Sequence, residues 1–84
     1  MQFVTQEISG HEGLVRNLFA ARDLGTPTAR RLFPGVRGVA IMPKAFDDVA
    51  SAAAWLEQTA ERGGVALAVS IGVQRWLIGA WVSA

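Results

Sequence analysis

Hydrophobic residues recur along this chain with two different periods, and the change of period separates predicted strands from predicted helices. Residues 36–42, 65–71 and 74–82 are short, mostly apolar runs that end at proline, glycine or serine. Residues 1–8 are more polar, but they contain the strand-forming pair Phe3-Val4 and end at Ser9-Gly10. Large and small side chains alternate along 65–71, whereas both faces of 74–82 are apolar. We therefore predict four strands, the last two forming a C-terminal β-hairpin.

Helical periodicity and helix-end signals mark three further segments. Residues 10–24 follow a capping-box sequence and place their apolar side chains on one face. A Thr-Pro pair then starts a short second helix over 26–33, which Pro34 ends because it disfavours helical dihedrals in the residue before it. Residues 44–62 predict a third helix, with two aspartates in its first turns where they complement the helix dipole.

The resulting element order is β-α-α-β-α-β-β in one small α+β domain covering residues 1–84. The unit from 36 to 71 has the order of a right-handed β-α-β crossover, which pairs its two strands in parallel. We expect a four-stranded mixed sheet with the helices packed on one face.

Composition restricts where such a domain works. The chain has no cysteine, which is unusual for a small extracellular domain, and residues 1–8 lack the basic and apolar regions of a signal peptide, so we expect a cytoplasmic protein. Its C-terminal apolar runs are each far shorter than the roughly 20 residues that span a bilayer. With 51% apolar and 18% charged residues, the chain has apolar surface to spare after its core is filled, which favours a partner protein or a homodimer.

Residues that carry chemistry are scarce. The one histidine, His11, has no orienting partner at helical spacing, and Asp47 and Asp48 diverge by about 100° on a helix, so they do not share an ion easily. No serine lies in a nucleophile-elbow sequence and no phosphate-binding loop is present. The prediction is a protein that is not an enzyme, with no catalytic residue, no cofactor and no metal.

Nucleic acid binding is the alternative that the charge distribution supports. Residues 12–37 hold five arginines against two acidic residues, and Ala21 and Gly25 have the spacing of a helix-turn-helix turn before Arg30 and Arg31. The sequence Gly35-Val36-Arg37-Gly38 also has the four-residue form of the loop that holds nucleotides in KH domains, although a strand rather than a helix follows it here.

Two features predict a protein-binding surface. On a helix over 44–62, Trp55 lies opposite Phe46 among polar residues, which is unusual for tryptophan and typical of interfaces. The two-sided apolar strand 74–82 is either a buried central strand or an edge that pairs with another chain. The candidate partner-binding residues are Trp55, Arg62, Arg22, Arg30, Arg31 and Arg37, and the candidate oligomer contacts are Trp76 and Trp81.

Three functions fit these observations. The first is a small inhibitor or adaptor that occupies a partner's surface, by analogy in size with phage and mobile-element inhibitors of bacterial defence complexes. The second is a nucleic-acid-binding module that uses the Arg-rich helical hairpin, and the third is a subunit of a larger assembly that makes contact through the C-terminal hairpin. A protein partner is expected first and no membrane association is expected.

Overall fold

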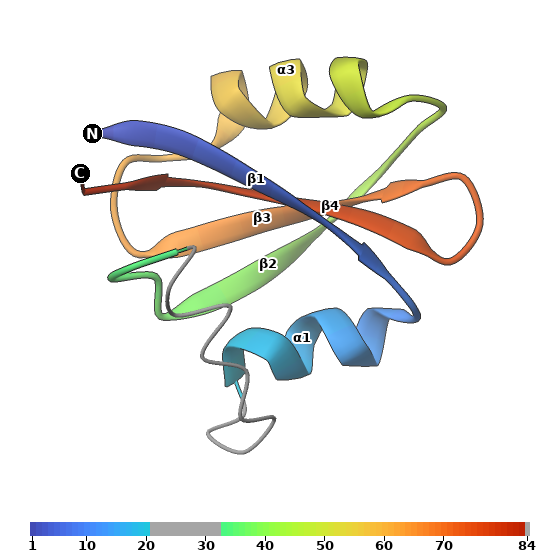
Figure 1. Cartoon of the computed structure of the whole chain (residues 1–84), viewed down its shortest axis with the longest axis horizontal. Coiled ribbons are helices and arrows are strands. Elements are labelled where there is room, and N and C mark those ends of the chain that lie inside the picture. The colour runs from blue at the N-terminus through green and yellow to red at the C-terminus, as the bar shows by residue number, and fades with distance from the viewer. Residues whose placement is uncertain (21–32, 84) are drawn as a thin grey trace.

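A computed structural model of the chain describes residues 1–20 and 33–83 (Figure 1). The described part has the α+β composition that the sequence predicts. Its elements are β1 (Gln2–Ser9), α1 (Glu12–Ala20), β2 (Gly38–Phe46), α3 (Val49–Thr59), β3 (Val65–Ile71) and β4 (Arg75–Val82). The short helix predicted over 26–33 lies outside the described residues.

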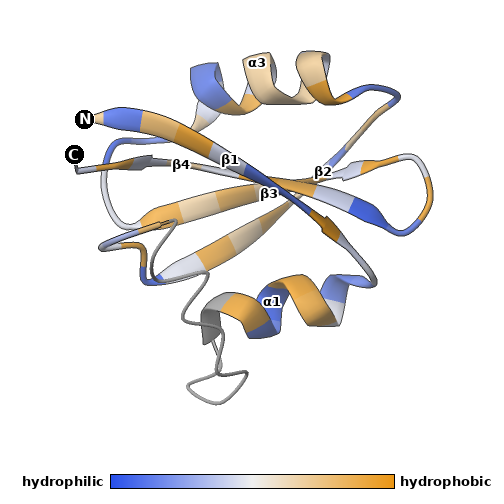
Figure 2. Ribbon diagram, viewed as in Figure 1, coloured by the Kyte–Doolittle hydropathy of each residue, from blue (hydrophilic) through white to orange (hydrophobic). Residues whose placement is uncertain are grey.

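The strands form one mixed sheet in the order β1-β4-β3-β2. β2 and β3 pair in parallel through the crossover helix α3, β3 and β4 form the expected antiparallel hairpin, and β1 pairs antiparallel with β4. The predicted mixed four-stranded sheet is confirmed. Figure 2 shows hydrophobic to neutral residues along most of β3 and β4, whereas β1 carries a hydrophilic stretch between two hydrophobic ones.

The two helices lie on opposite faces of the sheet, and not on one face as expected (Figure 1). On one face Val15 of α1 joins a core with Ala66, Ala68 and Ile78. On the other, Leu56 of α3 packs in a core with residues that alternate with these along the same strands, including Val69, Ile71 and Leu77. The physical reason is that β3 and β4 are apolar on both faces, and each face needs a cover.

The helix predicted over 44–62 is shorter than expected, because β2 continues through Pro43 as far as Phe46. Asp48 is the N-cap residue of α3: its Oδ1 accepts a hydrogen bond from the Ser51 backbone N–H at 2.8 Å. Phe46 and Trp55 therefore lie on different elements, and the predicted placement of these two residues on opposite sides of one helix is wrong.

β4 is a central strand with β1 on one side and β3 on the other. Its backbone is already paired on both sides, so strand addition from another chain at β4, one of the two predicted arrangements, is not available. Trp76 and Trp81 are half-buried on opposite faces of this strand. No helix in the described part of the chain is long and apolar enough to cross a membrane.

Candidate protein-binding site at the β2 bulge

The edge strand β2 bulges where its pairing with β3 changes register. Ile41 pairs with Ala68 and Ala45 pairs with Ser70, so four residues of β2 span the length of two residues of β3. Pro43 lies inside this bulge, where its lack of a backbone N–H breaks no ladder hydrogen bond. Bulges bend a strand and redirect its side chains, and they are frequent next to functional sites. We call residues 42–44 the β2 bulge.

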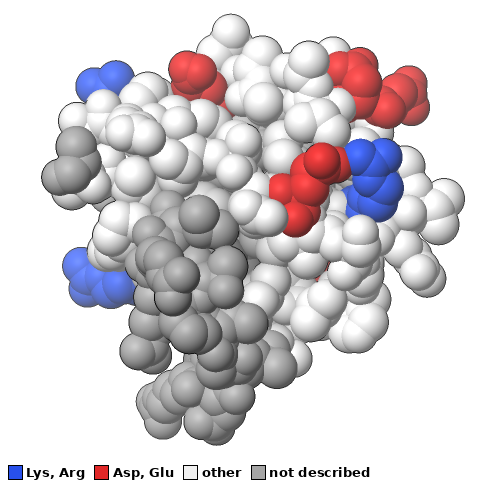
Figure 3. Space-filling view, in the orientation of Figure 1, with Lys and Arg blue, Asp and Glu red and all other residues white. Residues whose placement is uncertain are grey.

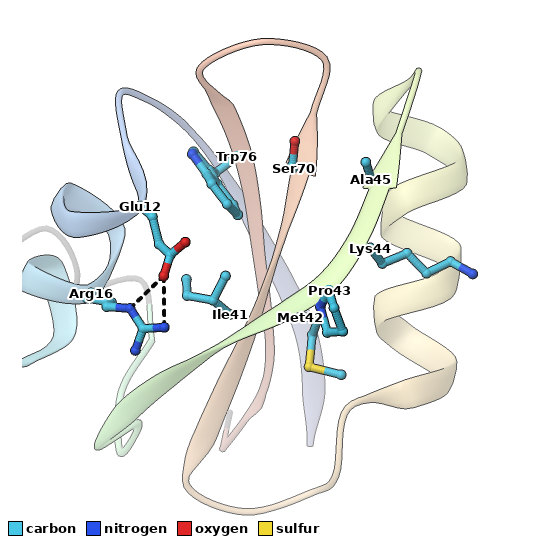
Figure 4. Close-up of a pocket in the computed structure, with 9 residues that line it drawn as sticks. All are labelled: Glu12, Arg16, Ile41, Met42, Pro43, Lys44, Ala45, Ser70 and Trp76. Atoms are coloured by element: carbon cyan, nitrogen blue, oxygen red, sulfur yellow. Dashed lines mark hydrogen bonds and ion pairs between the residues drawn. The ribbon is translucent and has the colours of Figure 1, made fainter.

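A groove of about 460 Å³ lies between the β2 bulge and α1 (Figure 4). Ile41 and Trp76 lie between the two walls, Ser70 adds a hydroxyl, and Glu12 and Arg16 of α1 face them from the other side. The remaining lining residues come from β2: Met42, Pro43, Lys44 and Ala45. The groove therefore has an apolar interior with one polar rim, a composition typical of sites that take an apolar side chain of a ligand.

Two polar contacts hold the walls of this groove. The Trp76 indole Nε1–H donates to the Gly10 carbonyl at 3.2 Å, which fixes the ring beside the start of α1. Arg16 donates through Nε and Nη2 to Glu12 Oε1 at 3.0 and 2.9 Å, an exposed i,i+4 ion pair. Because these charges compensate each other, the rim offers hydrogen-bonding groups without a large net charge.

An aromatic cluster lies on the other side of the same bulge. The Phe46 and Trp55 ring centroids are 5.8 Å apart, and Lys44 Nζ lies 5.3 Å from the Trp55 ring centroid and 5.7 Å from that of Phe46. In Figure 4 the Lys44 side chain points away from the groove toward α3. Trp55 is half-buried, so part of its ring is accessible beside the exposed ammonium group. Tryptophan is enriched at the energetic centre of protein interfaces.

Arg62 does not join Trp55, although both were predicted as partner-binding residues. Its guanidinium carbon lies 4.5 Å from the Trp81 ring centroid. Trp81 in turn meets Phe3 of β1 edge-to-face, at a centroid distance of 5.2 Å. The structure therefore places the predicted residues Arg62 and Trp81 together above the β1 side of the sheet, apart from the β2 bulge.

The predicted arginine surface is not brought together within the described residues. Arg37 is exposed just before β2, and its backbone N–H donates to the Gly64 carbonyl at 2.8 Å. Arg22, Arg30 and Arg31 lie outside the described residues, as does the predicted helix-turn-helix hairpin. On the face shown in Figure 3, the basic side chains of the described residues lie at separate places, and one of them lies directly against an acidic side chain.

The residues considered for chemistry have local structural roles. His11 is exposed, and its Nδ1 accepts from the Leu14 backbone N–H at 3.2 Å, so it caps the start of α1. Hydrogen bonds from the Ser51 backbone N–H and hydroxyl hold the pKa of Asp48 below its usual value. Within residues 1–20 and 33–83, no three His, Cys, Asp or Glu side chains are grouped as metal ligands.

A comparison of the chain with protein-family models, with curated proteins and with solved structures finds no match.

The groove and the bulge are the features that sequence reasoning missed. Pro43 was interpreted as the end of a strand, whereas it is the middle of a bulged one. The available signal was the apolar pair Ala45-Phe46 shortly after Pro43, which continues the strand pattern once extra residues are allowed. Trp55 was found for a different reason from the one the structure gives. Trp76 lines the groove, and its role as an oligomer contact stays a prediction.

Proposed function

We propose that this protein is a small, non-enzymatic binding protein that acts by occupying a surface of a partner protein, with the β2 bulge and its two flanks as the docking site. One observation carries the proposal: a single irregular strand brings an apolar groove and a half-exposed Trp–Phe–Lys cluster to the same edge of the sheet. Both an inhibitor and an adaptor fit this description. The narrower proposal, a phage-type inhibitor of a bacterial defence complex, rests on the small size of the chain alone.

The chemistry of the two flanks supports a protein ligand. An accessible tryptophan buries a large apolar area at little cost in side-chain entropy, and truncation of such an anchor typically weakens binding by about 2 kcal/mol or more, roughly 30-fold in Kd. The groove opposite is large enough for an apolar side chain of the partner, and its Glu12–Arg16 rim can exchange hydrogen bonds with a partner's backbone.

The test is affinity capture from a lysate of the source cell after nuclease treatment, read by mass spectrometry and then by titration with the purified partner. Wild-type protein and Arg37→Ala, which lies at the other end of β2, should retain one stoichiometric protein partner. Trp55→Ala should lose it, with Kd raised roughly 30-fold. Because Trp55 is half-buried, the exposed Lys44→Glu serves as a second variant that leaves the cores untouched.

The proposal fails if both variants bind the partner as wild type does while circular dichroism shows the same fold. It also fails if binding is lost on nuclease treatment and falls steeply with salt, which is the behaviour of a nucleic-acid-binding module.

A further inference from the structure

The outer edge of β1 is regular along its full length. Its pairing with β4 runs without a break from Gln2 opposite Val82 to Ser9 opposite Arg75. The principal packing of α1 is against β2, and that of α3 is against β2, β3 and β4. Within the described residues, β1 is thus an eight-residue edge strand with neither helix packed mainly on it.

The hydrogen-bond pattern shows which amides of β1 face outward. The Gly10 N–H donates to the Gln74 carbonyl at 2.8 Å, and these residues continue the β1–β4 register. Hydrogen-bonded and non-hydrogen-bonded pairs alternate in an antiparallel ladder, so the even-numbered residues of β1 bond to β4. The backbone groups of the odd-numbered residues consequently point away from the sheet: Phe3, Thr5, Glu7 and Ser9.

The side chains of β1 are self-complementary in one antiparallel register. We propose that a second copy of this chain pairs with β1 across a two-fold axis at Gln6, joining two sheets into one of eight strands. In that register Val4 lies opposite Ile8 of the second copy, and both are half-buried and belong to the α1 face. Thr5 lies opposite Glu7 on the other face, where its hydroxyl can donate to the carboxylate.

A register centred on Thr5 is less favourable. It places Val4 opposite Gln6 and Phe3 opposite Glu7, so each apolar side chain of the edge meets a polar one. The Gln6-centred register instead pairs Val4 with Ile8 and Thr5 with Glu7, and Phe3 opposite Ser9 is the one apolar side chain of the edge that meets a polar one.

The charges of the edge permit this contact. A charged side chain normally protects an edge strand from pairing, and Glu7 is the only charged residue of β1. Its carboxylate forms an ion pair with Arg75 of β4, so its charge is compensated within the same chain. The whole chain has a formal net charge of only +1, so two copies repel each other weakly.

Cysteine cross-linking tests both the dimer and its register, because the native chain has no cysteine. Gln6→Cys would face its own symmetry mate in a non-hydrogen-bonded pair with Cα atoms about 4.5 Å apart, within the range that a disulfide bridges. Thr5→Cys is the matched control, since its symmetry mate lies diagonally, beyond the roughly 7 Å limit. Both positions are exposed.

We expect Gln6→Cys to form a covalent dimer under mild oxidation and Thr5→Cys to remain at least tenfold less cross-linked. Sedimentation of the wild-type chain should show a concentration-dependent species of twice its mass. A wild-type chain that stays monomeric at millimolar concentration, or cross-linking that favours Thr5→Cys, would overturn the proposal.

Proline variants separate the dimer from the fold. Thr5→Pro removes only an outward N–H, so the monomer should stay folded while dimerisation weakens by at least tenfold. Gln6→Pro removes an N–H that bonds to β4 and should lower the thermal midpoint of the monomer. If Thr5→Pro dimerises like wild type, β1 is not the contact. This site is separate from the β2 bulge, so Lys44→Glu should leave dimerisation unchanged, and either proposal can fail alone.

Discussion

The two edges of the sheet are built in opposite ways. β2 is irregular: its register breaks at the bulge, a proline lies in it, and α1 and α3 pack on it from the two faces. β1 is regular, contains no proline, and keeps one register against β4 over eight residues. The irregular edge presents side chains, as a groove and an aromatic cluster, whereas the regular edge presents backbone amides. The difference teaches that the two edges of one small sheet can expose different kinds of atoms.

Both edge strands pair with central strands. The largest loss of stability is therefore expected from a substitution in the core that covers those central strands. Leu56 of α3 is fully buried among Val69, Ile71 and Leu77. Leu56→Ala should lower the free energy of unfolding by about 2–5 kcal/mol, because it leaves a cavity under α3. Urea unfolding followed by tryptophan fluorescence measures this loss. Leu56→Met is the volume-conserving control and should cost less than about 1.5 kcal/mol.

Two glycines allow the two edge strands to be compared: Gly79 of β4 lies against Phe3 of β1, and Gly38 begins β2. A Cβ added at Gly79 would lie 2.5 Å from Phe3 Cζ and 3.3 Å from Leu56 Cδ1, whereas one added at Gly38, at the start of β2, would meet no atom within 4 Å. Gly79→Ala should therefore destabilise the protein by about 1–3 kcal/mol, since the ring that attaches β1 must move. Gly38→Ala should be close to neutral in the same unfolding assay, and equal losses at the two positions would contradict this account of β1.

A pH-dependent contribution is expected at the helix cap that follows β2. The pKa of Asp48 is lower in the folded chain, so its carboxylate contributes stability above its unfolded pKa of about 3.9, and this contribution is lost as pH falls through the lower folded value. Asp48→Asn keeps a capping oxygen but does not titrate. Thermal unfolding between pH 7 and pH 3 should therefore decline less steeply in Asp48→Asn than in wild type.

The smallest effect is expected at the charged residue of the β1 edge. Glu7 and Arg75 form an ion pair with about half of each side chain exposed. Glu7→Gln should change the free energy of unfolding by less than about 1 kcal/mol, because exposed ion pairs contribute little. A loss of several kcal/mol in chemical denaturation would mean that this pair holds β1 in place and that the edge is less independent than we describe.

The strands were predictable because their signals are local. The alternation in 65–71, the glycine after it and the apolar run 74–82 specify a hairpin without knowledge of the rest of the chain. The position of β4 between β1 and β3 depends instead on a pairing between residues more than 65 positions apart, and no local pattern encodes it. The prediction that the helices share one face of the sheet was wrong for a related reason. Ala66 and Ala68 were recognised as a separate face, but such small side chains gave no indication that a second core forms on it.

The site was predictable only in part. The prediction of Trp55 rested on its position among polar residues of a helix over 44–62, and it found the residue despite an incorrect helix boundary. Predicting the bulge requires knowing how many residues of β2 lie opposite each residue of β3. That number depends on the pairing of the two strands and cannot be seen in either strand alone. Arg62 and Trp81 lie 19 positions apart in the chain, and only the sheet brings them together.

The pairing of Gln2 with Val82 also brings the two ends of the chain to the same corner of the molecule (Figure 1). A short linker could join these ends, and the chain could then be reopened at Val73, which is 86% exposed in the turn between β3 and β4. The resulting circular permutant would begin with β4 and continue directly into β1. The most distant strand pairing of the natural order would thereby become a local hairpin, with every contact of the sheet retained.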